Sequence, residues 1–270
     1  MSHPKRRKLE ALIRGLDHVV VAYSGGIDST LVLKVAAEQL GNGAVAATAV
    51  SPSLAKGDLE EAQRVAEDIG VRHVLLNSTE VDDPRYRKND PQRCYFCKTN
   101  VYDTLIAYAG GEGFTWILDG TNADDLGDHR PGLRAAREHG VRSPLQECGI
   151  GKTEIRTWAR ERGLPNWDRP ANACLSSRIP YGSKVTAAKL AQVEAAEAVL
   201  AEEGFRQFRV RHHGEVARLE VDADELPTAL AKSELLTARI RETGFLYVTL
   251  DLAGFRSGSM NDALRTSTTT

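Results

Sequence analysis

Six residues near the start of the chain have the types and spacing of a phosphate-binding loop. The stretch Ser24-Gly-Gly-Ile-Asp-Ser29 follows an apolar run, Val19–Ala22, that is typical of a buried strand. The two glycines permit backbone angles that a Cβ atom would forbid, and the helix expected to follow offers N–H groups to an anion. No lysine follows the glycines, which excludes a Walker A loop, because that motif uses lysine for the β- and γ-phosphates. The stretch therefore predicts a phosphate site of another kind.

Cys174 is the strongest candidate for a nucleophile. It lies in a segment of small and polar residues, Ala173-Cys-Leu-Ser-Ser-Arg178, with Arg178 four positions further on. A neighbouring cation lowers the pKa of a thiol and raises the fraction of reactive thiolate. We therefore interpret Cys174 and Arg178 as catalytic, the alternative being an inert cysteine in the core.

Cys94 and Cys97 form a second group of cysteines. Their Cys-x-x-Cys spacing is compatible with a redox pair, half of a zinc site, part of an iron–sulfur site, or two helix positions without a role. Together with Cys174 they could hold three irons of a [4Fe–4S] cluster and leave the fourth iron open. Cys148 lies outside both motifs.

Polar residues elsewhere could bind metal or phosphate. Asp119-Gly-Thr-Asn122 ends an apolar strand, and the nearby Asp124, Asp125 and Asp128 could hold Mg²⁺ against a pyrophosphate. Two arginines lie two positions apart on an expected strand in the second half of the chain, so their side chains share one face of that strand. This pair could bind a phosphate, or it could simply be exposed charge on the surface. These are Arg209 and Arg211. The acidic residues of the same region that could bind a metal are Glu215, Glu220 and Asp222.

Strands and helices alternate between residues 18 and 122, which predicts an α/β fold with a parallel sheet covered on both faces. The expected strands are 19–22, 44–50, 71–76 and 115–119, and the expected helices are 5–16, 27–39, 58–69, 93–109 and 152–163. Residues 79–92 and 126–145 read as irregular, with a short fifth strand at 143–145. Ligands bind at the carboxyl ends of parallel strands, so the loops 24–30, 50–53 and 120–125 are expected to contribute to one site.

The pattern of expected helices and strands changes after residue 182. A long alanine-rich helix at 186–203 is followed by two alternating segments, further helical segments and a last strand at 245–250. We therefore expect a nucleotide-binding domain over 1–182, a smaller α+β domain over 183–264 and a disordered tail over 265–270.

Net charge, apolar runs and cysteine count argue against a nucleic-acid-binding, membrane-spanning or secreted protein. The formal net charge of −2 argues against a large nucleic-acid surface, which usually shows as a basic face. There is no apolar run of transmembrane length, and the basic N-terminus lacks the apolar segment of a signal peptide. Four cysteines in 270 residues do not make a secreted disulfide framework. A cytoplasmic protein is expected.

The loop resembles the S-G-G-x-D-S pyrophosphate loop (PP-loop) of the ATP pyrophosphatase superfamily. Four further stretches together resemble the LarE family of ATP-dependent sulfur transferases, which help to make the nickel-pincer nucleotide cofactor of lactate racemase. They are Arg93-Cys-Tyr-Phe-Cys-Lys98, Ala173-Cys-Leu-Ser-Ser-Arg178, Arg209-Val-Arg-His-His-Gly214 and Gly254-Phe-Arg-Ser-Gly-Ser-Met-Asn261. The resemblance covers nearly the whole chain.

This resemblance implies a reaction. ATP adenylylates a carboxylate of a pyridinium-3,5-biscarboxylate mononucleotide, Cys174 attacks, AMP leaves, and cleavage of the cysteine C–S bond releases a thiocarboxylate and leaves dehydroalanine. Arg209 and Arg211 would hold the substrate phosphate. Some family members use three cysteines for a [4Fe–4S] cluster that carries the sulfur, and Cys94, Cys97 and Cys174 keep that alternative open.

The resemblance also implies binding residues and partners. ATP and Mg²⁺ are the expected cofactors. Independently of the resemblance, the residue types make Asp128 and Glu220 the expected metal ligands. The ATP-binding residues implied are Ala22, Tyr23, Ser24, Gly25, Gly26, Asp28, Ser29, Thr30, Val50, Ser51, Gly120, Thr121, Asn122 and Asp125. The expected partners are other proteins of nickel-pincer cofactor biosynthesis and further copies of this chain.

Other classes stay open at this point. A tRNA thiolase shares the chemistry of adenylylation and cysteine attack, but it should show a basic face or an added RNA-binding domain. An amidotransferase-coupled synthetase would give Cys174 no role. A nucleotide-binding regulatory module would bind ATP without releasing pyrophosphate.

Overall fold

The computed structural model describes residues 3–127, 131–170 and 172–256. The chain divides into two compact units, the first formed by Met1–Asp83 and Gln92–Asn172 and the second by Pro84–Pro91 and Ala173–Thr270. The division after residue 172 lies ten residues before the expected boundary, and the expected tail at 265–270 lies outside the described residues. No helix in the described part of the chain has both the length and the apolar character needed to cross a membrane.

The first unit is built on a four-stranded parallel sheet with the order β3-β2-β1-β4. The strands are β1 (Val19–Ala22), β2 (Ala44–Val50), β3 (Arg72–Asn77) and β4 (Trp116–Leu118). β1 lies between two neighbours, and its three valines are fully buried, as the apolar run predicted. Val19 and Val21 pack into the core on one face, whereas Val20 packs into the core on the other. The predicted α/β fold is confirmed.

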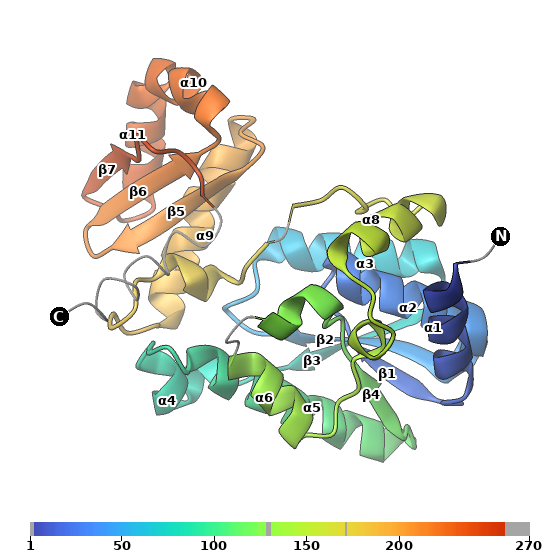
Figure 1. The fold of residues 1–270 in the computed structure, drawn as a ribbon. Helices are drawn as coiled ribbons and strands as arrows, with labels where there is room; N and C mark the ends of the chain where they lie inside the picture. Colours follow the sequence, from blue (N-terminus) through green and yellow to red (C-terminus); the bar gives the residue numbers. More distant parts are fainter. Residues whose placement is uncertain (1–2, 128–130, 171, 257–270) are drawn as a thin grey trace. The chain divides into compact units, whose positions relative to one another are not determined.

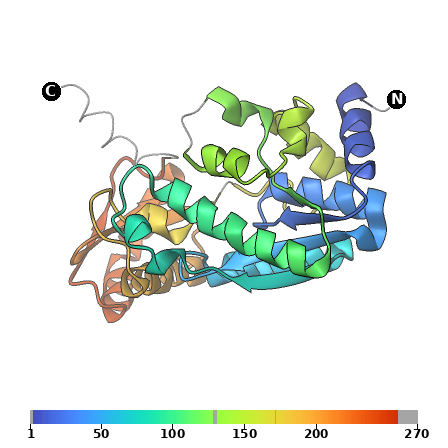
Figure 2. The ribbon, with the colours of Figure 1, turned by 90° about the horizontal axis from the view of Figure 1, so that it is seen from below.

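Helices cover both faces of this sheet (Figure 1). They are α1 (Pro4–Arg14), α2 (Ile27–Leu40), α3 (Lys56–Ile69), α5 (Arg93–Glu112), α6 (Pro131–Glu138), α7 (Pro144–Glu147) and α8 (Lys152–Glu161). Short 3₁₀ turns lie at η1 (Gly41–Gly43), η2 (Glu80–Asp82) and η3 (Ala123–Gly127). Figure 2 shows α5 running along one face of the sheet. The core on that face includes α5 and α6, and the core on the other includes α1, α2 and α8.

Three expectations for this region were wrong. The segment 126–145 contains helix α6, whose Ala135 and Ala136 are buried, so its arginine-rich sequence is one face of an amphipathic helix. The expected strand at 143–145 is the start of α7. Arg142 makes one isolated parallel bridge to Leu118, and Pro144, which cannot donate to a ladder, then begins the helix. Residues 79–92 include η2 and helix α4 (Pro84–Arg87) instead of a plain loop.

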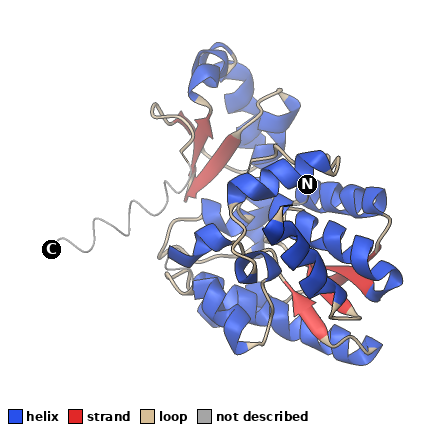
Figure 3. Ribbon diagram, turned by 45° about the vertical axis from the view of Figure 1, so that its right-hand side comes forward, coloured by secondary structure: helices blue, strands red, loops and turns tan. Residues whose placement is uncertain are grey.

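The second unit is the smaller α+β part that the sequence predicts. Its sheet has the order β5-β6-β7, with β5 (Phe208–His213) antiparallel to β6 (Val216–Val221) and β6 parallel to β7 (Tyr247–Leu250). The other elements are α4, η4 (Leu175–Arg178), α9 (Ala187–Glu202), η5 (Ala223–Glu225), α10 (Leu226–Ala231) and α11 (Ser233–Glu242). Figure 3 shows these short strands with the helices beside them. Leu200 of α9 and Ile240 of α11 pack with Val210 and Leu219 of the sheet in one core.

Candidate active site

The loop after β1 is held in shape by its own serines and by α3. Gly25 has φ 72°, and a Cβ atom there would lie 2.8 Å from Cβ of Ala62, so both the backbone angle and the packing require glycine. The hydroxyls of Ser24 and Ser29 lie 3.2 Å apart, and Ser29 also donates to the carbonyl of Gly26. Gly26 is the N-cap of α2 and provides no side-chain cap. The N–H groups of the first turn are therefore available to an anion.

Asn166 fixes this loop from a distant part of the chain. Its side-chain amide is buried and donates to the carbonyl of Gly25 and to Oγ1 of Thr30, each at 2.9 Å. Asn166 was not among the residues predicted to form the site. The only local signal was an asparagine inside a proline-rich bridge, which does not indicate a contact across 136 positions.

Asp28 is paired with a lysine that the sequence analysis also missed. Nζ of Lys152 donates to both carboxylate oxygens of Asp28, at 2.7 and 2.6 Å. Burial raises the pKa of Asp28, the nearby Asp125 raises it further, and Lys152 and Asn122 oppose the rise. Lys152 begins α8, and its Gly-Lys-Thr sequence at a helix start was the available signal. The structure therefore places a cation and a second carboxylate beside the loop aspartate.

The loop after β4 contacts the loop after β1 directly. A Cβ atom on Gly120 would lie 2.6 Å from the backbone nitrogen of Ser29 and 2.9 Å from its Cα, so glycine permits this approach. Asp119 orders the turn by accepting hydrogen bonds from Thr121, Ser143 and Tyr102. Asn122 in turn donates its backbone N–H to the carboxylate of Asp125. The meeting of these two loops agrees with the expectation from the parallel sheet.

Replacing Gly120 with alanine is expected to push these two loops apart. Overpacking against fixed backbone should lower the free energy of unfolding by about 1–3 kcal/mol. The affinity for an ATP analogue should fall at least about tenfold, because the loop at the start of α2 is displaced. Calorimetric titration and thermal unfolding would measure both effects. Gly110→Ala is the control, because nothing lies within 4 Å of its added Cβ inside α5. Unchanged affinity in the Gly120→Ala protein would contradict the assignment of this contact.

The loop after β2 is organised by a buried glutamate. Glu80 is 1% exposed, and its carboxylate accepts hydrogen bonds from the hydroxyls of Ser51, Ser53 and Ser78, the last two at 2.7 and 2.5 Å. Val50 is the last residue of β2, so the loop begins at Ser51. Val50 and Ser51 were predicted to contribute to the site, whereas Glu80, which comes from the loop after β3, was not.

Cys174 lies in the second unit as an exposed free thiol immediately before η4. Arg178, which is 1% exposed, donates to the backbone carbonyl of Cys174 at 3.1 Å and to that of Ala173. Its guanidinium also forms a two-point ion pair with Glu197, with N–O distances of 2.9 and 3.1 Å. Arg178 therefore anchors the backbone on which Cys174 is presented. Glu197, which the sequence analysis missed, balances the charge.

Arg209 and Arg211 lie on β5, as predicted, but they differ in their surroundings. Arg211 is buried, donates to the carbonyl of Ser177 at 3.0 Å and pairs with Glu220 at 2.7 Å. The guanidinium of Arg209 lies 5.1 Å from the ring centroid of Phe255. The other oxygen of Glu220 accepts from Arg218 at 3.0 Å, so each carboxylate oxygen has an arginine partner. The role of Glu220 as a metal ligand stays a prediction, and Asp128 lies outside the described residues.

Known proteins with similar sequences identify the family. Residues 12–146 match the asparagine synthase family. The chain is 40% identical over 261 residues to the pyridinium-3,5-bisthiocarboxylic acid mononucleotide synthase of Lactiplantibacillus plantarum, which covers 96% of this chain and 95% of that protein. The chain belongs to the LarE family. Two further relatives align along most of the chain: Synechocystis protein slr1717, 46% identical with 98% and 99% of the two chains covered, and Methanocaldococcus jannaschii protein MJ0830, 29% identical with 88% and 91% covered.

The cysteines of this LarE family member fall into different units. Cys94 and Cys97 lie one turn apart at the start of α5, in the first unit, whereas Cys174 belongs to the second unit. Within residues 3–127, 131–170 and 172–256, no group of three or more His, Cys, Asp or Glu side chains is arranged to hold a metal ion. Cys148 is 4% exposed, and burial raises the pKa of its thiol, which makes it a poor nucleophile at neutral pH.

Proposed function

We propose that the protein adenylylates a carboxylate of pyridinium-3,5-biscarboxylic acid mononucleotide with ATP and then transfers sulfur to it from Cys174. One observation carries the proposal: a LarE family chain holds an exposed thiol on a loop fixed by a buried arginine. Acyl transfer from an adenylate requires a nucleophile that is held in position for attack on the acyl carbon, and a fixed backbone provides this. The product would be the thiocarboxylate precursor of a nickel-pincer cofactor.

The first step takes place on the first unit. The N–H groups at the start of α2 and the ammonium of Lys152 would bind the β- and γ-phosphates of ATP. The neighbouring carboxylates of Asp28 and Asp125 suit Mg²⁺, which prefers one or two carboxylates together with phosphate oxygens and would neutralise charge on the leaving pyrophosphate. A carboxylate oxygen of the substrate attacks the α-phosphorus, pyrophosphate leaves, and an acyl adenylate remains.

The second step uses Cys174. Its thiolate attacks the acyl carbon, AMP leaves, and a thioester joins substrate and protein. A base then removes the Cα proton of residue 174, the electron pair forms a Cα=Cβ double bond, and the Cβ–S bond breaks. The thiocarboxylate departs with the sulfur, and dehydroalanine remains in the chain. Each protein molecule therefore reacts once.

Intact-mass spectrometry tests this reaction. After incubation with ATP, Mg²⁺ and the nucleotide substrate, the protein should be lighter by about 34 Da, the mass of one H₂S, with the loss mapped to residue 174. Thiocarboxylate, AMP and pyrophosphate should form in equal amounts. Absence of both product and mass change would overturn the proposal and favour a tRNA thiolase, which salt-sensitive tRNA binding would then reveal.

A second candidate is a catalytic version that uses a [4Fe–4S] cluster. It is favoured by the exposed Cys94 and the partly exposed Cys97 one helical turn apart. These two thiolates and that of Cys174 would supply three ligands, and the cluster would carry the transferable sulfide. About four irons per chain in anaerobically purified protein, with product formed at unchanged protein mass, would establish this version in place of the sacrificial one.

The proposed setting of the protein follows from its substrate. Because a relative is named as a synthase of a pyridinium mononucleotide, we place the protein in the cytoplasm with other proteins of nickel-pincer cofactor biosynthesis. Self-association into a homo-oligomer belongs to the same proposal.

A further inference from the structure

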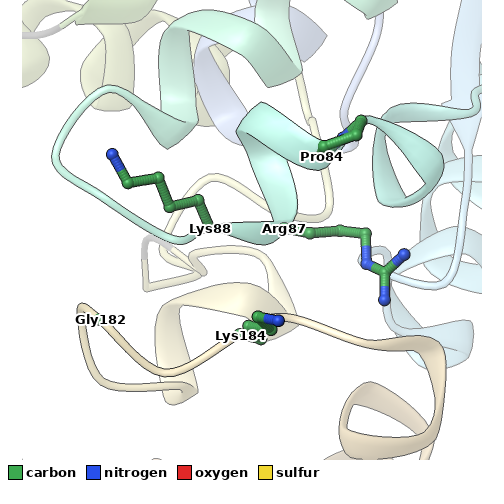
Figure 4. A pocket seen from close by; sticks show the side chains of 5 residues that line it. All are labelled: Pro84, Arg87, Lys88, Gly182 and Lys184. Atoms are coloured by element: carbon green, nitrogen blue, oxygen red, sulfur yellow. The ribbon is translucent and has the colours of Figure 1, made fainter.

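The second unit contains a pocket that the residues discussed above do not line. Its volume is about 420 Å³, and the lining residues are Pro84, Arg87, Lys88, Gly182 and Lys184 (Figure 4). Three of the five are basic and none is acidic. The volume lies within the range of small-molecule sites and exceeds what one phosphate group requires.

The two segments that form the pocket are hydrogen-bonded to each other. Asn89 is fully buried, and its amide donates to the carbonyls of Pro180 and Ser183 at 2.8 and 2.9 Å. The backbone N–H of Gly182 donates to the carbonyl of Asn89, and that of Val185 donates to the carbonyl of Arg87. The pocket is therefore formed before a ligand arrives, which reduces the entropy cost of binding.

Two of the three cations have no acidic partner in the described part of the chain. Among the described residues, the side chains of Arg87 and Lys184 make no ion pair or hydrogen bond, whereas Lys88 lies 3.4 Å from Asp90. Figure 4 shows Arg87 and Lys88 extending in opposite directions from one segment and Lys184 on the facing segment. A ligand between the two segments would meet the unpaired charges of Arg87 and Lys184.

The helix that carries Arg87 also supports the cysteine loop. Its Tyr86 is 1% exposed and shares a hydrogen bond with the hydroxyl of Ser176, two residues after Cys174. The same short helix, α4, thus contacts η4 through Tyr86 and lines the pocket through Arg87. Binding in the pocket would act on an element that holds the reactive loop.

We propose that this pocket binds the phosphate end of a nucleoside 5′-monophosphate. The inference rests on the proposed function, in which both the pyridinium substrate and the released AMP are 5′-monophosphates. A phosphate monoester carries up to two negative charges, which Arg87 and Lys184 would match, and the planar guanidinium can donate two parallel hydrogen bonds to it. The remaining volume accommodates the ribose. This site is separate from Arg211, whose guanidinium is paired with Glu220.

Calorimetric titration of the full-length protein tests the proposal. A non-hydrolysable ATP analogue first fills the nucleotide site of the first unit, so that added AMP reports on other sites. AMP, nicotinic acid mononucleotide and inorganic phosphate are then titrated separately into the wild-type protein and into Arg87→Gln, Lys184→Gln and the double variant. Each single change should weaken binding of the occupant nucleotide about tenfold and the double change about 100-fold. The nucleotide that loses this affinity identifies the occupant as product-like or substrate-like.

Arg206→Gln is the matched control. Arg206 is an exposed arginine of the same unit that lies near Asp224 and Glu225, outside the pocket. Its replacement should leave the affinities for AMP and for nicotinic acid mononucleotide unchanged. Equal nucleotide binding by the double variant and the wild type would overturn the proposal. Inorganic phosphate binding as tightly as either nucleotide would also overturn it, because the site would then recognise an oxyanion alone. Pyrophosphate release by the wild type is measured separately, so failure of the proposed function would be recognised independently.

Discussion

Replacing Cys174 with alanine is expected to abolish thiocarboxylate formation while leaving adenylylation intact. The alanine side chain cannot supply sulfur, but the loop at the start of α2, Asp28 and Lys152 belong to the first unit and are unchanged. Arg178 donates to the backbone carbonyl of residue 174, which alanine keeps, so the loop should retain its shape. The acyl adenylate should therefore accumulate or hydrolyse, and AMP should form without loss of about 34 Da from the protein.

Two sets of controls make this result specific. Cys148→Ala changes a buried cysteine that the mechanism does not use, and this protein should retain full product formation after a check by thermal unfolding. The double variant Cys94→Ala, Cys97→Ala should still produce one thiocarboxylate per chain if Cys174 is the sulfur donor. Loss of product in that double variant would show that the cluster version operates. Product formation at the wild-type level by Cys174→Ala would contradict both versions.

Replacing Lys152 with methionine should have the second largest effect, on the adenylylation step. The change keeps the length of the side chain but removes a cation that donates to both oxygens of Asp28. Loss of these charge-assisted contacts at the proposed phosphate site should reduce the single-turnover rate constant of pyrophosphate release about 100-fold. Lys34→Met is the control, because Lys34 lies on α2 and pairs only loosely with Glu38, at 3.6 Å.

The pH dependence of the Lys152→Met protein gives an independent readout. Lys152 lowers the pKa of Asp28 against the larger effect of burial, which raises it. When the cation is removed, burial and Asp125 still raise the pKa of Asp28 and Lys152 no longer lowers it, so this pKa should rise. If the ionised carboxylate is the active form, the acidic limb of the pyrophosphate-release profile should move to higher pH, and activity should partly recover as the pH rises. An unchanged acidic limb would show that Asp28 does not titrate in this step.

Local sequence was sufficient for the elements whose residues are neighbours in the chain. An apolar run, two glycines and a helix predicted β1, the loop and the start of α2, because strand burial and turn geometry depend on a few consecutive residues. The same kind of reasoning was wrong at 143–145, where Ser-Pro-Leu was expected to form a short strand and Pro144 instead begins a helix.

Residue types and spacing were enough to predict the α/β class, the loop after β1, the strand positions of Arg209 and Arg211, and Cys174 as the candidate nucleophile. The side chains that surround them depend on the packing of distant elements. Asp28 meets Lys152 across 124 positions, and Arg178, read as a neighbour of the thiol, directs its charge to Glu197 of α9 and its donors to backbone carbonyls. Spacing along one element reports the face on which a residue lies. The partner of a charge depends on which distant elements pack there, and no local pattern contains that information.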